Sequence, residues 1–156
     1  MYKVLTIGLA LLAPIVGIAG PASVSENLIG LTTPNGKTAS DMLDLWFNQH
    51  KPGEAFDRYV SRTDITDHHG KNTVHSFEKI RAEEIKITGT KIHFDIKQII
   101  AQGDLVFAHV YVTHIDEPKF GGDLIEIMRF KDGKMVEHWN IHVPIEQDPA
   151  VYFGTQ

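Results

Sequence analysis

Hydrophobic positions in the first half of the chain recur at the spacing of amphipathic helices. One helix is expected from about Thr38, with Thr38 or Ser40 as its N-cap, and it should end near residues 50–51 because Pro52 restricts the residue before it. Pro52 suits the first turn of a second helix, and a third helix is expected from about Thr73. The apolar faces of these helices carry Met42, Leu43, Leu45, Trp46, Ala55, Phe56, Tyr59, Val60, Phe77 and Ile80.

The second half of the chain changes to the period of two that is typical of strands. Apolar and polar residues alternate over residues 92–97, and residues 105–114 carry apolar side chains on both faces, which indicates a central strand. Two further strands are joined through Asp132 and Gly133, a pair that suits a two-residue hairpin turn. Helices followed by an antiparallel meander predict an α+β fold in which N-terminal helices pack on a curved, mainly antiparallel sheet.

The N-terminus has the plan of a secretory signal peptide. Lys3 precedes an apolar run over residues 4–19, and small residues follow, so we expect a signal peptide over residues 1–22 with cleavage after Ala22 or Ala19. The alternative is a membrane anchor, which Pro14 and three glycines disfavour. The mature protein is therefore expected to be periplasmic or secreted.

The remaining sequence is organised as one domain between two short polar segments. Residues 23–37 are predicted to be an irregular tether, residues 38–146 the domain, and residues 147–156 a C-terminal tail. The absence of cysteine excludes disulfides, and loss of residues 1–22 changes the formal net charge from −5 to −6. This acidic balance is not that of a nucleic-acid-binding protein, and no membrane association is expected after cleavage.

Two sequence strings resemble a known family. They are IIAQGDLVFAH at residues 99–109 and IMRFKDGKMVEHWN at residues 127–140. Over residues 38–144 the chain is similar to the SnoaL-like (polyketide cyclase-like) group of the nuclear transport factor 2-like superfamily. The resemblance implies a cone-shaped α+β barrel around one apolar pocket, often as a homodimer. The superfamily includes polyketide cyclases, ketosteroid isomerases, dehydratases and non-enzymatic binders, so the fold does not fix the function.

The chain departs from the pattern of this group at two positions. Where SnoaL-type cyclases usually carry an aspartate as general acid/base after the His-Trp pair, this sequence has Asn140, and an amide orients a carbonyl but does not exchange protons usefully. A second motif, commonly Tyr-x-x-His-Asn-Pro, is represented here only by His68. The departure at Asn140 weakens the case for the standard cyclase mechanism.

Strand alternation selects the candidate catalytic residues. If the cavity lies on the face of residues 105, 107, 109 and 111, His109 shares it with His138 and Asn140, although one bulge would reverse this assignment. Either histidine is then a candidate base, with Asn140 polarising a carbonyl. The alternative is that both are structural histidines of the core. Candidate substrate-binding residues are His68, Tyr59, Phe107, Tyr111, Glu126, Arg129 and Trp139.

Several of these candidates also have a structural interpretation. Glu126 and Arg129 are expected to form a buried pair that holds the hairpin, whereas Trp139 and Tyr59 suit packing in the core. No cofactor is expected, because no phosphate-binding or dinucleotide-binding motif is present. No metal site is demanded either, although His68, His109 and His138 together remain an alternative.

Two classes of function remain open at this level. The first is cofactor-independent proton transfer, such as aldol cyclisation, isomerisation or dehydration, on a small carbonyl compound. The second is a non-catalytic domain that binds a small hydrophobic molecule or supports assembly.

Overall fold

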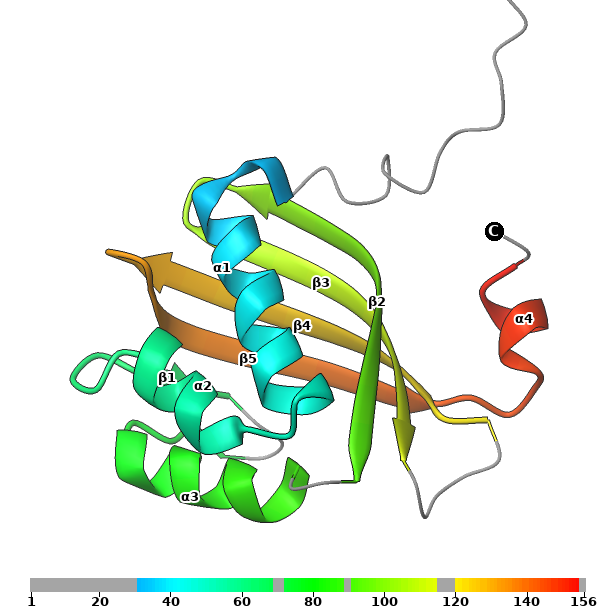
Figure 1. Ribbon diagram of the computed structural model, residues 1–156, viewed down its shortest axis with the longest axis horizontal. Helices are drawn as coiled ribbons and strands as arrows, with labels where there is room; N and C mark the ends of the chain where they lie inside the picture. Colours follow the sequence, from blue (N-terminus) through cyan, green and yellow to red (C-terminus); the bar gives the residue numbers. More distant parts are fainter. Residues whose placement is uncertain (1–30, 69–71, 89–90, 115–119, 155–156) are drawn as a thin grey trace, which may run out of the picture.

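The computed structural model describes residues 31–68, 72–88, 91–114 and 120–154. Its sheet has the order β1-β5-β4-β3-β2, in which the last four strands form an antiparallel meander and β1 pairs parallel with β5. Helix α1 crosses one face of this sheet, whereas α4 lies away from the other helices (Figure 1). The helices are α1 (Pro34–Leu43), the π-helix η2 (Asp44–Asn48), α2 (Pro52–Tyr59), α3 (Phe77–Thr88) and α4 (Pro149–Tyr152). The strands are β1 (Thr66–Asp67), β2 (Ile92–Gln102), β3 (Leu105–His114), β4 (Gly122–Lys131) and β5 (Lys134–Pro144).

The α+β prediction, with N-terminal helices on a curved and mainly antiparallel sheet, is confirmed. The sheet stays open, because β1 and β2 are at its two ends and do not pair with each other. The inner face of the sheet buries every second residue of β3 and β4, among them Val106, Ala108, Val110 and Met128. These side chains form one core with the apolar sides of α1, η2 and α2.

An aromatic stack connects the helices to the sheet. Phe47 stacks on Trp46 and, from its other side, on Phe94 of β2, with ring centroids 4.6 Å and 3.6 Å away. Trp46 also meets the edge of Phe56 from α2 at 4.8 Å. The π-helix is the element that carries Trp46 and Phe47, and such wide turns occur frequently beside functional sites.

The structure corrects several predicted boundaries. Helix α1 begins at Pro34, with Thr33 rather than Thr38 or Ser40 as the N-cap, so residues 34–37 of the predicted tether are helical. Proline at the first helical position is favoured because its missing N–H has no partner to lose there. Helix α3 begins at Phe77 rather than near Thr73. Two short elements were not expected from the sequence. They are strand β1 and helix α4, and α4 lies within the segment that was predicted to be a C-terminal tail.

The predicted signal peptide, residues 1–22, and most of the predicted tether lie outside the described residues. Among the residues that the structure describes, no helix is both long and apolar enough to cross a membrane.

Candidate functional site

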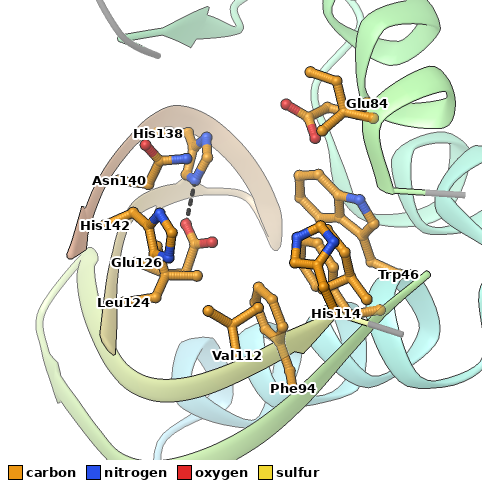
Figure 2. Close-up of a pocket in the computed structure, with 13 residues that line it drawn as sticks. Trp46, Glu84, Phe94, Val112, His114, Leu124, Glu126, His138, Asn140 and His142 are labelled. Carbon is orange, nitrogen blue, oxygen red and sulfur yellow. Dashed lines mark hydrogen bonds and ion pairs between the residues drawn. The ribbon is translucent and has the colours of Figure 1, made fainter. Parts of the chain in front are cut away.

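A cavity of about 180 Å³ lies between the helices and the inner face of the sheet. Its apolar wall comprises Trp46, Phe47, Ile87, Ile92, Phe94, Val112 and Leu124. Its polar residues are Glu84, His114, Glu126, His138, Asn140 and His142 (Figure 2). An apolar chamber with a few convergent polar groups is the usual form of a small-molecule site.

Cross-strand register brings the polar residues of the sheet together. Glu126 on β4 pairs with Asn140 on β5, and Met128 pairs with His138, so Glu126 and His138 are diagonal neighbours on one face. A bulge near Val136 interrupts the pairing and sets the alternation of the residues that follow it. His138, Asn140 and His142 consequently all line the cavity, as the alternation of the fourth predicted strand indicated.

His138 is held between two carboxylates. Its Nε2 lies 2.5 Å from Glu126 Oε2, and its Nδ1 lies 2.9 Å from Asp67 Oδ1. All three residues are buried, with 4%, 3% and 4% of the surface of His138, Glu126 and Asp67 exposed. This chain of three side chains, Asp67–His138–Glu126, is called the acid–imidazole triad below.

Backbone pairing fixes Asp67 in the triad. Strand β1 runs parallel to β5 with Asp67 opposite His138, and the next amide, that of His68, donates to the His138 carbonyl at 2.9 Å. On its other side Asp67 exchanges two backbone hydrogen bonds of 2.8 Å with Val74. The carboxylate is therefore presented to His138 by main-chain bonds on both sides.

The triad keeps His138 protonated. Burial on its own lowers the pKa of His138, but the charges of Glu126 and Asp67 and their hydrogen bonds outweigh it and raise the pKa to about 10. At neutral pH the imidazolium therefore cannot act as a base. The group of the triad that both lines the cavity and carries negative charge is Glu126.

A second carboxyl group lies across the cavity. Glu84 on α3 is 6% exposed, and Figure 2 shows its carboxyl group on the helical side, facing His138 and Asn140. Burial raises the pKa of Glu84, the charge of His138 lowers it, and the charges of Glu126 and Asp67 raise it; the net pKa is about 7. The cavity thus contains one carboxyl group that is paired with His138 and a second one that binds a proton near neutral pH.

Some predicted site residues lie on the other face of the sheet. The inner set of β3 is Val106, Ala108, Val110 and Val112, so the assignment of His109, Phe107 and Tyr111 to the cavity was wrong. His109 instead binds Asp123 at 2.6 Å on the outer face, where the hydroxyl of Tyr152 donates to the same carboxylate at 2.9 Å. Because β3 has apolar residues on both faces, alternation alone did not distinguish inside from outside.

The expected Glu126–Arg129 pair does not form. Residues three apart in a strand point to opposite faces, and Arg129 forms ion pairs with Glu137 and Asp104 on the outer face. His68 also binds Glu137, at 3.0 Å, and stacks on Trp139 with ring centroids 4.8 Å apart. Neither of these two aromatic residues lines the cavity.

Tyr59 is partly buried and packs against the core, as its structural interpretation indicated. The histidines of the alternative metal site are not brought together, because His109 and His138 are on opposite faces of the sheet. Within the described ranges, no group of three or more His, Asp or Glu side chains is arranged to hold a metal ion.

Two acidic residues of the site were missed by sequence reasoning, although each left a signal. Glu84 follows Phe77 and Ile80 at helical spacing and is buried with them, so it is a charged residue on an apolar helix face. Asp67 follows buried Ile65 at the spacing of a strand, next to the His68 to which the family motif pointed. Both signals were polar residues at positions of the core pattern.

Comparison with known proteins identifies the family of this chain. The family model of the SnoaL-like domain matches residues 39–138. The chain belongs to the SnoaL-like domain family. A search of curated proteins found no match.

Solved structures share the fold at low sequence identity. A SnoaL-like polyketide cyclase, provisionally so named, from Jannaschia sp. CCS1 has a TM-score of 0.58 at 13% identity, with 70% of this chain and 85% of that chain covered. A nuclear transport factor 2-like protein of unknown function from Burkholderia xenovorans has a TM-score of 0.57 at 15% identity, with 80% of this chain and 98% of that chain covered. AclR from Streptomyces galilaeus, provisionally named a hydroxylase, has a TM-score of 0.53 at 21% identity, with 85% of this chain and 96% of that chain covered. These names differ, so the likeness establishes the fold alone.

The triad predicts a pH-dependent contribution of His138 to stability. Because its folded-state pKa is raised from 6.5 to about 10, this contribution is complete below pH 6.5 and is lost as pH rises through 10. We expect His138→Gln to lower the free energy of unfolding by about 3–5 kcal/mol at pH 6, since it leaves buried carboxylates without their cation. Urea unfolding at pH 6, 8 and 10 should show the difference from wild type shrinking. His109→Gln, which changes a histidine on the outer face that is about a third exposed, is the control. A His138→Gln difference that does not depend on pH would contradict the prediction.

Proposed function

We propose that this SnoaL-like protein is a cofactor-independent enzyme that removes a proton next to the carbonyl group of a small apolar compound. The observation that carries the proposal is the position of Glu126, a carboxylate that lines an apolar cavity while His138 binds its other side. A buried carboxylate is poorly hydrated, and proton abstraction by a positioned carboxylate is a standard form of general base catalysis.

Each member of the triad has a separate role in this proposal. Glu126 takes the proton from carbon, while the His138 imidazolium, held by Asp67, fixes the carboxylate and keeps it ionised. Asn140 lies opposite Glu126 in the sheet and lines the same cavity, where its amide N–H suits the oxygen of the enolate. Asn140 therefore polarises the carbonyl, and the base is Glu126 rather than a histidine.

Proton exchange on a simple ketone tests the proposal. In deuterium oxide, the wild-type protein should exchange the α-protons of cyclohexanone above the buffer rate, measured by ¹H NMR. Glu126→Gln should lower this rate by about 10²–10⁴-fold, the usual contribution of a general base. His109→Gln, on the outer face, should retain it. Exchange that Glu126→Gln leaves unchanged, or no exchange at all in the wild-type protein, would contradict the proposed enzymatic function.

The alternative is a non-catalytic binding domain, and the closed hydrogen bonding of the triad is the observation that favours it. His138 has a carboxylate partner on both ring nitrogens, so the triad satisfies itself without a substrate. Native mass spectrometry of the purified protein separates the two functions. A retained small molecule that is bound and not converted would favour the binding domain.

We also propose a homodimer through the outer face of the sheet. Ile100, Phe107, Ile141 and Val143 are 40–57% exposed there, and the rows Ile100–Phe107–Ile127 and His109–Ile125–Ile141 are adjacent across the strands. Contiguous exposed apolar surface of this kind marks an interface. A second copy of the same face is its simplest apolar partner, because a twofold contact pairs a patch with itself.

Light scattering after size exclusion checks the dimer. The wild-type protein should have twice the mass of one chain, and Phe107→Glu should have the mass of one chain because a charge cannot be buried unpaired in an apolar interface. Ile85→Glu is the matched control, since Ile85 on α3 is 39% exposed against 40% for Phe107. A wild-type monomer would contradict the proposal.

Export remains a proposal that rests on residues 1–22. Expression of the full chain in a bacterium should yield a periplasmic protein whose intact mass corresponds to an N-terminus at Ser23 or Gly20. Leu11→Arg, which interrupts the apolar run, should leave the protein unprocessed. An unprocessed wild-type chain would show that this segment is not a cleaved signal.

A further inference from the structure

Glu84 is the buried titratable group of the cavity that proton abstraction by Glu126 does not use. It comes from α3, whereas Glu126 comes from β4, so the two carboxyl groups approach the cavity from its helical wall and its sheet wall. A molecule bound between these walls meets both groups. Glu84 is 6% exposed, and burial disfavours the charged form of a carboxyl group.

Glu84 is also in contact with a second hollow. Together with Asp67, Thr73, Lys79 and Glu83 it lines a second pocket of about 420 Å³. The same residue therefore lines both the apolar cavity and a pocket with several charged side chains. This arrangement lets a carboxyl group give a proton into the cavity and recover one from outside it.

We propose that Glu84 is the general acid of this site and that the substrate is a β-hydroxy carbonyl compound, which the protein dehydrates. The proposal rests on the proposed function, because Glu126 supplies the base. Glu126 takes the α-proton, and the electrons of that C–H bond form the new carbon–carbon double bond. The C–O bond to the β-hydroxyl breaks, its electron pair stays on oxygen, and the Glu84 proton converts the leaving group to water.

The step is balanced without a cofactor. It turns a protonated Glu84 and an ionised Glu126 into an ionised Glu84 and a protonated Glu126, with an α,β-unsaturated carbonyl compound and water as products. Return of one proton from Glu126 to Glu84 through water restores the site. Two carboxyl groups that are driven to different protonation states by their surroundings are a recurring basis for acid and base roles at one pH, and burial places the pKa of Glu84 at about 7.

One probe, 3-hydroxycyclohexanone, separates the two roles. Its α-proton exchange in deuterium oxide, followed by NMR, reports the base, and the ultraviolet absorbance of the enone product reports elimination. Glu84→Gln should lower elimination by about 10²-fold or more, in the range of a lost general acid, and retain exchange. Glu126→Gln should lower both. In the wild-type protein the ratio of elimination to exchange should fall as pH rises through about 7, as Glu84 loses its proton.

The control is Glu78→Gln, the same chemical change in the first turn of α3 at an exposed position, and it should leave both rates unchanged. Circular dichroism of each variant establishes that it is folded. Equal loss of exchange and elimination in folded Glu84→Gln would overturn the acid role and assign Glu84 to structure. Elimination that is unaffected by Glu84→Gln, with exchange intact, would overturn it while leaving the base in place. Absence of both reactions in the wild-type protein would overturn the proposed function and this inference with it.

Discussion

The buried ion pair between His138 and Glu126 is the interaction on which the site depends. An imidazolium in the interior is tolerated because two carboxyl groups face it, and their charges and hydrogen bonds raise the pKa of His138 to about 10. The fold therefore places the proposed base, Glu126, in a largely apolar cavity together with its hydrogen-bond partner from the neighbouring strand.

Three separate strands contribute the three side chains of the triad. Strands β4 and β5 bring Glu126 and His138 together by register, while the two-residue strand β1 adds Asp67 from the segment between α2 and α3. The π-helix then places Trp46 against the same chamber, with its ring centroid 6.2 Å from that of His138. Aromatic side chains thus line one side of the cavity and polar residues of the strands line the other. Burial and nearby charges in this environment shift the pKa values of Glu84 and His138.

His109 and His138 lie on opposite faces of the sheet and have different environments. His109 and His138 each bind a carboxylate, yet His109 is about a third exposed and is bordered by the C-terminal residues Tyr152 and Phe153, whereas His138 is enclosed. Water screens the charges of the more exposed outer pair. The inner pair is desolvated, so its charges act strongly on Glu84 and on any bound molecule. The proposed chemistry uses the inner face, and the proposed dimer uses the exposed apolar rows of the outer face.

The sequence by itself determined the order of the three main helical segments and the four long strands, the α+β class and the hairpin at Asp132 and Gly133, because hydrophobic period and turn residues are local properties. It also placed His138 and Asn140 on one face, because residues two apart in a strand share a face. The bulge lies before both residues and does not separate them. Only the tertiary structure decided that His109 faces outward, because β3 is apolar on both sides. It alone joined Asp67 and Glu84 to the site, since pairing between segments some seventy residues apart and the burial of a helix face depend on packing, which no local pattern specifies.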